Sequence, residues 1–368
     1  MSQLFNIDLP LIANKIAKTP LREIPQKVGR GFRHWVQEYP VHIIVQTVTA
    51  CNLACEHCFI TNYGKEMPDA KNNIMRLDLF AEMLERIAPA VKHAQLFQFS
   101  TFEELMHKHI FDMMDLVLKV NPKIKFPIHS NTMLVDEEKL NKLATYPVSE
   151  FTVSLDGMKK ETVERFKTGA TYEIILDTLK RAVALPWDAN VGVVFVAHKD
   201  NIAELPDYVD FVRDMGIRTI YVNNLLSFTP KFHDKYLYTK QGNPEAEKLF
   251  SEAIARVERN NMTIHMPRLK PESLGCSIVE AMYIDCHGNV SPCDFLAEST
   301  PFELFGETKQ GAPVRFGNVM TDDVMEIYRA ARTREFRNQH RHGEIPDTCT
   351  HCIDAYGLMC SKRTKYGV

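Results

Sequence analysis

Cys51-Asn52-Leu53-Ala54-Cys55-Glu56-His57-Cys58-Phe59 is the stretch that decides the fold, and it directly follows the apolar run 41–48. Its three thiols are separated by three and by two other residues, so one short loop can surround an inorganic cube. A cubane iron-sulfur cluster contains four irons, and three thiolates therefore leave one iron without a protein ligand. A structural zinc loop is the alternative, although such loops usually combine paired Cys-x-x-Cys units into four ligands.

The composition is that of an ordinary folded protein, with 368 residues of which 45% are hydrophobic and 25% charged. This length allows two domains, or one large barrel with an appendage. The net charge of -3 and the lack of a long basic run argue against a nucleic-acid partner. No apolar run reaches the roughly 20 residues that cross a membrane, and no signal-peptide core follows Met1, so we expect a cytoplasmic protein without a membrane partner.

The nine cysteines form two groups, and more than 200 residues separate Cys58 in the first group from Cys276 in the second. Cysteines scattered through an apolar core would not leave such a gap. In a reducing compartment, grouped cysteines are more often metal ligands or catalytic thiols than disulfides. Both groups are therefore candidate metal sites.

From residue 41 onward, short apolar runs alternate with longer amphipathic stretches, which is typical of βα units around a parallel sheet. We expect strands over 41–48, 94–99, 124–129, 150–155, 190–197 and 218–222. The helices expected between them cover 77–91, 107–120, 137–145, 172–185 and 202–215. Six such units predict an α/β fold with a partial TIM-like barrel, in which chemistry gathers at the carboxyl ends of the strands. The three-cysteine loop lies at that end.

The composition divides the chain into three regions. We expect an N-terminal helical prefix, a barrel and a small cysteine-rich domain over 1–40, 41–266 and 267–368. Pro267 and Pro271 mark the second boundary, because cysteine, glycine and short strands follow them. The smaller elements expected around and beyond this boundary are a helix over 244–260, a strand over 263–266, a hairpin over 283–293 and a helix over 323–336.

The three-cysteine loop behind the first strand resembles that of the radical SAM superfamily. The resemblance implies that the open iron of a [4Fe-4S] cluster binds S-adenosyl-L-methionine. Reductive cleavage then yields a 5'-deoxyadenosyl radical that abstracts a hydrogen atom from a substrate. The implied class is a radical SAM oxidoreductase or maturase, with a reducing partner such as flavodoxin or ferredoxin.

Segments at the ends of the following strands are similar to cofactor-binding segments of that family. Ser100-Thr101-Phe102-Glu103-Glu104 stands where relatives carry a Gly-Gly-Glu-Pro turn, and Ser130-Asn131-Thr132 resembles their Thr-Asn-Gly. Glycines let backbone groups approach a ligand closely, which Thr101 and Phe102 do not. The resemblance implies cofactor contacts from His57, Phe59, Glu103, Asn131, Ser154 and Arg165. The alternative for Ser154, Asp156 and Arg165 is a helix cap with a surface helix, and for His57 a solvated ring.

The second group of cysteines resembles the SPASM and twitch extensions of the same superfamily, which carry auxiliary iron-sulfur clusters. The simplest assignment gives one auxiliary [4Fe-4S] cluster to Cys276, Cys293, Cys349 and Cys352. If Cys360 is also a ligand, the tail cysteines instead serve two incompletely ligated clusters. On spacing alone, a zinc ribbon is another alternative.

Cys286 is left over in the simplest assignment. A thiol that faces the cavity can give a hydrogen atom to a substrate radical, as in radical epimerases, so Cys286 is the candidate catalytic residue. The alternative is a free cysteine in a small apolar niche.

The sequence therefore predicts a radical SAM enzyme that acts on a small polar metabolite or a short peptide. An auxiliary cluster would help it complete an oxidation, an epimerisation or a coupling. Two alternatives stay open: a peptide or protein maturase that forms a side-chain cross-link, and a non-enzymatic iron-sulfur or zinc protein that transfers electrons or scaffolds a partner. The roughly 40 residues before the first strand are too few for a separate leader-binding domain, so we expect none.

Overall fold

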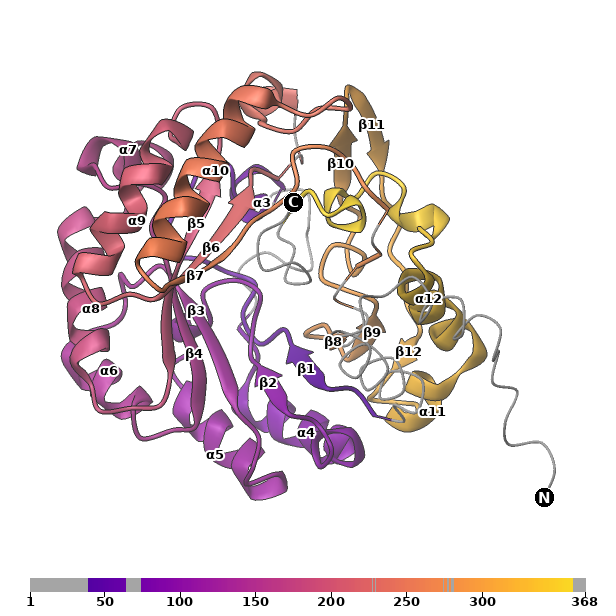
Figure 1. Ribbon diagram of the computed structural model, residues 1–368. Coiled ribbons are helices and arrows are strands. Elements are labelled where there is room, and N and C mark those ends of the chain that lie inside the picture. The colour runs from indigo at the N-terminus through magenta and orange to yellow at the C-terminus, as the bar shows by residue number, and fades with distance from the viewer. Residues whose placement is uncertain are drawn as a thin grey trace, which may run out of the picture. The chain divides into compact units, whose positions relative to one another are not determined.

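A computed structural model describes most of the chain, including the cysteines of both groups except Cys360 (Figure 1). The described residues are 39–63, 74–226, 228, 230–273, 275–276, 278 and 281–359. The expected helices of the prefix and the candidate ligand Cys360 lie outside these residues. The described residues from Pro40 onward belong to one compact unit.

Parallel strands stand side by side in the order of the sequence. They are β1 (His42–Val45), β2 (Leu96–Gln98), β3 (Phe126–Ser130), β4 (Val148–Ser154), β5 (Asn190–Ala197), β6 (Thr219–Asn224) and β7 (Thr263–His265). Each pairs in parallel with the next, and a parallel bridge between Leu96 and Lys125 joins β2 to β3. This parallel order confirms the predicted partial barrel. Its strands read as apolar runs because the sheet is buried beneath covering helices.

Helices connect these strands and cover their outer side (Figure 1). The longer ones are α4 (Leu77–Val91), α5 (Ile110–Val120), α8 (Tyr172–Ala184), α9 (Leu205–Asp214) and α10 (Pro244–Arg259), and the shorter ones are α6 (Glu137–Leu143) and α7 (Lys160–Phe166). The short α3 (Phe59–Tyr63) instead follows the three-cysteine loop. The buried residues of α4 recur at helical spacing, as at Phe80, Met83 and Ile87. At α10, the Asn243 side chain accepts a bond from the Ala246 N–H, which caps the helix start.

The helix expected over 107–120 begins later than predicted, at Ile110. The buried ring of His107 explains the difference, because its Nε2 lies 2.7 Å from the Met75 carbonyl oxygen. Its Nδ1 also accepts the backbone N–H of His109, at 3.0 Å. These bonds hold His107 outside the helix, and its ψ of 115° is extended.

The residues that follow β7, called the tail from here on, add five short strands and two helices to the described part of the chain. They are β8 (Ala281–Ile284), β9 (Asn289–Ser291), β10 (Pro301–Leu304), β11 (Glu307–Gln310), β12 (Gly317–Asn318), α11 (Val324–Arg329) and α12 (Ala331–His342). The hairpin expected over 283–293 is present as β8 and β9. The helix expected over 323–336 is interrupted at Ala330, whose ψ of 145° is extended rather than helical. The β10–β11 hairpin was not expected.

The first strand of the tail joins the sheet of the barrel. β8 pairs in parallel with β1, with Ile284 opposite Val45, and the Gln46 N–H donates to the Ile284 carbonyl at 2.8 Å. Sequence order gives no sign of this pairing, since β1 and β8 lie far apart in the chain. The pairing brings the residues that follow β8 to the same edge as the three-cysteine loop. The division at residues 266 and 267 stays a prediction.

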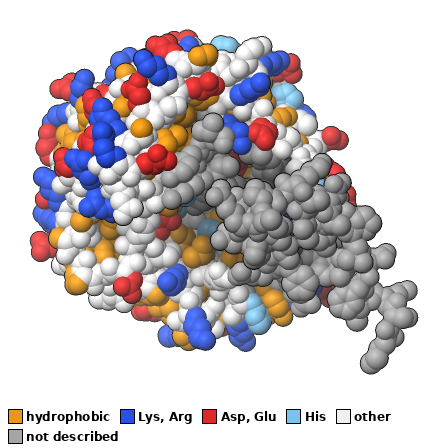
Figure 2. All heavy atoms as spheres, viewed as in Figure 1, with side chains coloured by type: hydrophobic (Ala, Val, Ile, Leu, Met, Phe, Trp, Pro, Cys, Tyr) orange, Lys and Arg blue, Asp and Glu red, His pale blue; other side chains and the backbone are white. Residues whose placement is uncertain are grey.

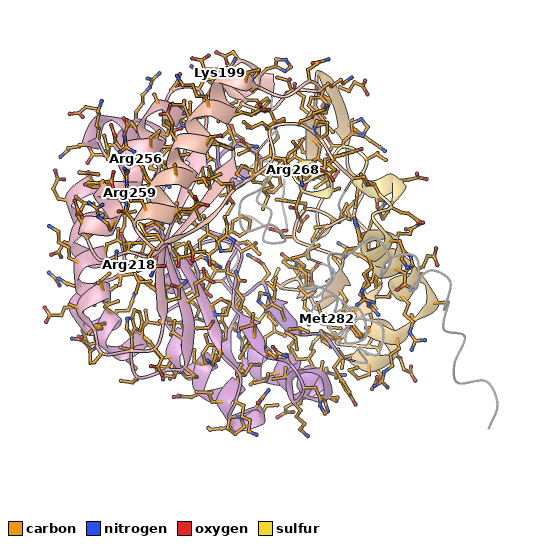
Figure 3. All side chains as sticks on the ribbon, in the orientation of Figure 1. Lys199, Arg218, Arg256, Arg259, Arg268 and Met282 are labelled. Atoms are coloured by element: carbon orange, nitrogen blue, oxygen red, sulfur yellow. The ribbon has the colours of Figure 1, made fainter. Side chains whose placement is uncertain are left out.

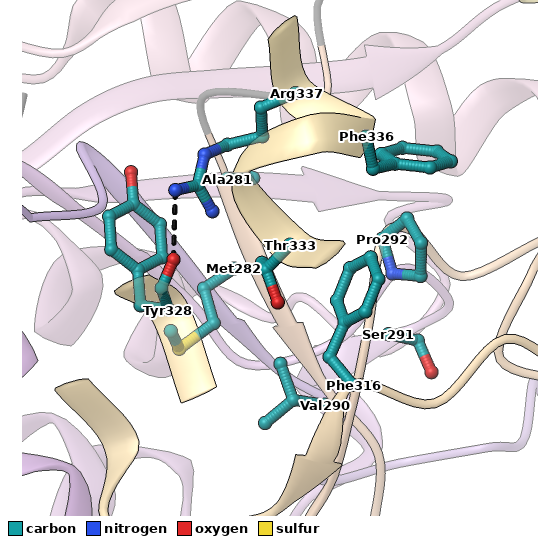
Figure 4. A pocket seen from close by; sticks show the side chains of 10 residues that line it. All are labelled: Ala281, Met282, Val290, Ser291, Pro292, Phe316, Tyr328, Thr333, Phe336 and Arg337. Atoms are coloured by element: carbon teal, nitrogen blue, oxygen red, sulfur yellow. Dashed lines mark hydrogen bonds between the residues drawn. The ribbon is translucent and has the colours of Figure 1, made fainter. Parts of the chain in front are cut away.

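The helices of the tail pack closely against its hairpin (Figure 4). A cavity of about 20 Å³ lies between them, which is room for no more than a water molecule. At its wall, the Arg337 guanidinium lies 3.9 Å from the centre of the Tyr328 ring and donates to the Tyr328 carbonyl at 2.8 Å. These contacts stabilise the join between α11 and α12, and the cavity is too small for a substrate.

The outer face of the barrel carries both signs of charge. Figure 2 shows Lys and Arg side chains interspersed with Asp and Glu over this side. Arg256 and Arg259 project from α10 (Figure 3), and Arg256 lies 2.7 Å from Asp207 and 2.8 Å from Asp210. Such pairs are typical of a solvated helix face. In the described part of the chain, no helix is both long and apolar enough to span a membrane.

Candidate functional site

The three-cysteine loop lies at the carboxyl end of β1 and is held by backbone bonds. The N–H of Ala54 donates to Thr168 at 3.0 Å, and the N–H of Glu56 donates to Phe166, also at 3.0 Å. The Asn62 side chain then closes the loop by donating to the carbonyls of Glu56 and Cys58. The loop therefore keeps its shape through contacts that do not involve the thiols.

The three thiols of this loop, Cys51, Cys55 and Cys58, are partly exposed and interact electrostatically with one another. Burial raises the pKa of all three, that of Cys55 to about 12, and the positive charge of Lys167 acts against this rise at Cys55 and Cys58. Soft thiolates that converge from one loop, with a cation behind them, suit the binding of an iron-sulfur cluster.

A buried ion pair lies behind the loop. Lys167 Nζ is 2.9 Å from Asp156 Oδ2, and the two side chains are only 5% and 2% exposed. Asp156 also accepts the N–H of Val196 at 2.9 Å, which fixes it to β5. It does not cap α7, whose N-cap is Lys159, so the helix-cap alternative is wrong for Asp156. Lys167 was missed by the sequence analysis, because nothing local indicates that its charge is buried.

His57 lies close to this ion pair. Burial lowers the pKa of its imidazole to about 4, and its Nδ1 is shielded from solvent. The ring of Phe59 lies 5.1 Å from that of Phe228. The His57 side chain as a whole is partly exposed. Its predicted contact with the cofactor and the alternative of a solvated ring therefore both stay predictions.

Glu103, Asn131 and Cys51 come together although they are far apart in the sequence. The Glu103 carboxylate accepts the Ser130 hydroxyl at 2.9 Å and the Asn131 N–H at 2.8 Å. The Asn131 amide nitrogen lies 3.4 Å from Cys51 Sγ. Burial raises the pKa of Glu103. Three of the predicted residues thus meet at one side of the loop.

The backbone of Thr132 explains the family pattern at this position. Its φ of 68° is in the left-handed region, which a glycine adopts without strain. The Thr132 N–H donates to Ser130 Oγ at 2.9 Å, which helps hold this conformation. The strained turn keeps Asn131 beside Cys51.

Gln46 holds the segment that replaces the glycine-rich turn. Its Oε1 accepts the N–H and the hydroxyl of Thr101, both at 3.1 Å, and the Tyr283 hydroxyl at 3.2 Å. The Ser100 hydroxyl donates to the Val48 carbonyl at 2.8 Å. Side-chain bonds thus fix a turn that glycines form in relatives. Gln46 was not singled out from the sequence, where it is one more polar residue after a strand.

Ser154 and Arg165 are less closely tied to the loop. Ser154 ends β4 and is partly exposed, while Arg165 is exposed on α7. The Arg165 guanidinium lies 5.3 Å from the centre of the Phe166 ring. Both stand on elements that flank the loop, and their predicted contacts with the cofactor stay predictions.

The second group of thiols lies in an apolar part of the tail. Cys349 belongs to a buried cluster with Leu296, Phe336 and Ala355, against which Cys293 and Cys352 also pack. Burial raises the pKa of Cys276 and Cys293 far above that of a free thiol, and nearby Cys352 and acidic side chains raise it further. The four candidate ligands Cys276, Cys293, Cys349 and Cys352 therefore lie near one another.

Two polar side chains contact these thiols. The Cys276 thiol donates to Asp354 Oδ2 at 2.7 Å, and His340 Nε2 lies 3.6 Å from Cys349 Sγ. Among the described residues, no three His, Cys, Asp or Glu side chains surround a single point as they would around one metal ion. In an iron-sulfur cube, each thiolate binds a different iron.

Cys286 and Asp294 connect the tail with the barrel edge. Cys286 is 7% exposed and follows β8, whose end lies beside the end of β1. Asp294 follows Cys293, lies within hydrogen-bond reach of the Thr101 side chain, and has its pKa raised by burial to about 6. Asp294 was missed by the sequence analysis, and its position next to a candidate ligand was the available signal.

Comparison with known proteins agrees with this arrangement. Residues 45–212 match the family model of the radical SAM superfamily, and residues 276–353 match that of SPASM, an iron-sulfur cluster-binding domain. A curated protein of Pyrococcus furiosus, the tungsten-containing aldehyde ferredoxin oxidoreductase cofactor-modifying protein, is 26% identical over 320 residues. That match covers 84% of this chain and 86% of the relative.

Two solved structures share the fold at low identity. Streptococcus suis SuiB bound to the precursor peptide SuiA matches with a TM-score of 0.58 and 14% identity, over 91% of this chain and 75% of that one. The protein anSMEcpe bound to AdoMet and the Cp18Cys peptide matches with a TM-score of 0.60 and 17% identity, over 87% of this chain and 89% of that one.

Proposed function

This chain belongs to the radical SAM superfamily and carries a C-terminal SPASM domain, and on that premise we propose that it is a maturase that oxidises or cross-links a short peptide. Its cofactors are a [4Fe-4S] cluster with S-adenosyl-L-methionine and auxiliary iron-sulfur chemistry in the tail. The zinc and scaffold alternatives are therefore set aside. When bound, these groups supply a 5'-deoxyadenosyl radical that removes a substrate hydrogen atom, and an acceptor for the electron left behind.

The proposal rests on the link between the two groups of thiols. β8 pairs with β1, and Asp294 lies within hydrogen-bond reach of Thr101, which follows β2 in the sequence. The tail therefore begins at the edge of the barrel that carries the three-cysteine loop. A substrate at this edge would lie between a source of radicals and an electron acceptor. This arrangement favours net oxidation or bond formation over a simple hydrogen transfer.

We assign the site residues as follows. Cys51, Cys55 and Cys58 hold the first cluster, and Cys276, Cys293, Cys349 and Cys352 hold the auxiliary one, while Cys360 as a further ligand stays a prediction. Glu103 offers an acceptor for the amino group of S-adenosyl-L-methionine, and Asn131, Ser154 and Arg165 offer polar contacts. His57 and Phe59 offer surface for the adenine. A closed, dry site around these groups would protect the radicals from unwanted hydrogen donors.

Two residues of the tail would act on the substrate. The Asp294 carboxylate, held near Thr101, offers a place for the proton that leaves an oxidised substrate. The Cys286 thiol could instead return a hydrogen atom, in which case the reaction would be an epimerisation. The products distinguish these cases, because oxidation removes hydrogen from the substrate and epimerisation replaces it.

Peptides are favoured as substrates because both solved structures named above have a peptide bound, SuiA in one and Cp18Cys in the other. A small polar molecule or cofactor is the second candidate. It is favoured by the cofactor-modifying relative, whose similarity extends over 84% of this chain. A reducing partner such as flavodoxin or ferredoxin would serve either substrate.

Anaerobic reconstitution tests the proposal. The purified chain is loaded with iron and sulfide, reduced with dithionite and given S-adenosyl-L-methionine, and 5'-deoxyadenosine is measured by liquid chromatography. We expect formation by the wild type and none by Cys55→Ala. A wild-type protein that holds iron but forms no 5'-deoxyadenosine would contradict the assigned chemistry.

A second experiment identifies the substrate and the outcome. Short peptides encoded beside the gene are incubated with the reduced enzyme in D₂O, and their mass is compared with that of untreated peptide. Oxidation or cross-linking lowers the mass of the peptide. Epimerisation through Cys286 instead adds deuterium from the solvent to the peptide, and the Cys286→Ala variant should add none. A modified small molecule with unmodified peptides would favour the second candidate.

A further inference from the structure

His340 occupies a place in the tail that the assigned chemistry does not yet use. It lies in the last turn of α12 and is 1% exposed. Its Nδ1 lies 3.1 Å from the backbone nitrogen of Cys276, and its Nε2 lies 3.6 Å from Cys349 Sγ. One imidazole thus contacts two candidate ligands that are far apart in the sequence.

The backbone contact decides which ring nitrogen carries the proton. The N–H of Cys276 is always a donor, so His340 Nδ1 must accept and cannot bear a proton. A neutral imidazole then carries its proton on Nε2. That proton points toward Cys349 Sγ, which becomes a thiolate when it binds iron.

The path of the chain makes this contact specific. Gly275 has a φ of 69°, and a Cβ at this position would lie 1.9 Å from the His340 carbonyl oxygen. The Ser273 hydroxyl donates to the carbonyl of Gly343, the residue after α12. The segment before Cys276 therefore crosses the end of α12 at a distance that only glycine allows.

Packing fixes the plane of the ring. The Phe336 ring lies 4.9 Å from that of His340 at an angle of 66°, one helical turn earlier on α12. Phe336 also belongs to the apolar cluster that contains Cys349. The imidazole is thus oriented by apolar contact before any cluster is bound, as is usual for side chains that hydrogen-bond to the ligands of a metal.

We propose that His340 is a positioning residue of the auxiliary cluster: it ties Cys276 to Cys349 and donates a hydrogen bond to the Cys349 thiolate, which raises the reduction potential of the cluster. The inference rests on the auxiliary cluster of the proposed function and not on the identity of the substrate. A hydrogen bond to a ligand sulfur stabilises the more negative, reduced cluster. The cluster is then a better acceptor for an electron from the substrate.

Asp354 acts on the same cluster in the opposite sense. Its carboxylate oxygen lies 2.7 Å from Cys276 Sγ, so its negative charge disfavours further negative charge on the cluster. The hydrogen bond from His340 to Cys349 has the opposite effect on the potential of the cluster. The potential would therefore depend on both side chains, and removal of the His340 donor should shift it downward.

Two substitutions separate the two contacts of His340. In His340→Asn, the side-chain oxygen replaces Nδ1 as the acceptor for Cys276, but no donor reaches Cys349. In His340→Gln, the amide nitrogen lies where Nε2 was and keeps the donor. Both are made in the full-length chain with Cys51→Ala, Cys55→Ala and Cys58→Ala, so that only the tail binds a cluster.

The measurement is a redox titration followed by electron paramagnetic resonance. At a fixed potential, we expect His340→Asn to lower the ratio of reduced to oxidised cluster about tenfold, which corresponds to about 59 mV for one electron. His340→Gln should lie much closer to the reference protein. His342→Asn, which changes an exposed histidine of the same turn, is the matched control and should not shift the potential.

An unchanged potential in His340→Asn, or an equal shift in His342→Asn, would overturn the proposal. If His340→Asn takes up no cluster, pulsed electron paramagnetic resonance of the reference protein, which keeps His340, is the test instead. With ¹⁵N-histidine incorporated, the reduced cluster should show a weak nitrogen coupling that persists in His351→Asn, which removes the histidine between Cys349 and Cys352. Absence of that coupling would also refute the hydrogen bond. Neither readout requires a substrate, so failure here is distinct from failure of the proposed function.

Discussion

The two groups of thiols are built in opposite ways. The first lies in one loop of eight residues, Cys51 to Cys58, and backbone bonds to residues 166 and 168 hold that loop. The second collects Cys276, Cys293, Cys349 and Cys352 from distant segments, and side chains such as His340 join them. A local site needs only its own loop and a support, whereas an assembled site depends on the packing of the whole tail.

Their electrostatic surroundings also differ. The Lys167 ammonium lies behind the first loop and favours the thiolate form of Cys55 and Cys58. Around the second group, Asp354 and Asp294 act on Cys276 and Cys293 in the opposite direction. A positive charge and a hydrogen-bond donor both favour a cluster that must gain an electron. The first loop has the charge, and in our proposal the tail has the donor, near two acids. The predictions below test whether this contrast holds.

The largest effect is expected from removing one ligand in each group. Cys55→Ala should lose about four irons and all formation of 5'-deoxyadenosine, because the first cluster no longer forms. Cys349→Ala should also lose about four irons but should still cleave S-adenosyl-L-methionine without forming the product. Iron analysis and chromatography measure both. Equal loss of cleavage in the two variants would show that the groups do not act separately.

The buried ion pair gives the next largest effect. Lys167→Met leaves Asp156 buried without a partner, which we expect to cost about 3–5 kcal/mol in the free energy of unfolding. Chemical denaturation measures this value, and iron content should fall with it. Lys160→Met is the control, because Lys160 makes an exposed pair with Glu173 and should change stability little. Similar results for the two lysines would mean that the first loop needs no charge behind it.

Gly275→Ala tests the assembled site in the same way. Its positive φ should cost about 1–3 kcal/mol, and the 1.9 Å approach to the His340 carbonyl oxygen adds a clash. Gly343→Ala is the matched control, since its φ is 78° but the nearest atom to a Cβ lies at 3.5 Å. We expect Gly275→Ala to lose more stability and more auxiliary iron than the control. If the control is affected as strongly, the crossing at His340 is not what holds the tail together.

A gradual effect is expected in the pH dependence of stability at the barrel edge below the first loop. Burial raises the pKa of Glu104 to about 8, and its carboxylate oxygens accept the N–H groups of Phe99 and His129. Because the folded pKa lies above the unfolded one, the stabilisation is complete below the unfolded pKa. It is lost as pH rises through about 8, at no more than about 1.4 kcal/mol per pH unit.

Glu104→Gln should remove this slope, since an amide does not ionise. Its single oxygen keeps only one of the two bonds from Phe99 and His129, so stability should fall by the same amount at every pH. Unfolding free energies measured from pH 5 to 8 test it, with the exposed Glu138→Gln as control. A slope that survives in Glu104→Gln would assign the pH dependence to other groups.

Periodicity in the sequence was sufficient to predict most of the barrel. The strands and helices from β1 to β7 lie close to their predicted ranges. The spacing of apolar residues marks the buried face of each element, and that spacing differs between a strand and a helix. The late start of α5 was missed because the His107 ring bonds to Met75, a contact between distant segments. The break at Ala330 likewise follows from how α11 and α12 pack.

The sequence by itself indicated the radical chemistry of this protein, because the candidate ligands of the first cluster lie within one loop and their spacing is local. It also determined the barrel, whose units repeat along the chain. Only the tertiary structure decided that β8 joins β1, that Lys167 lies beneath the thiols, and that His340 bridges Cys276 and Cys349. These contacts join segments far apart in the chain, where complementary packing and buried charge, rather than spacing, select the partners.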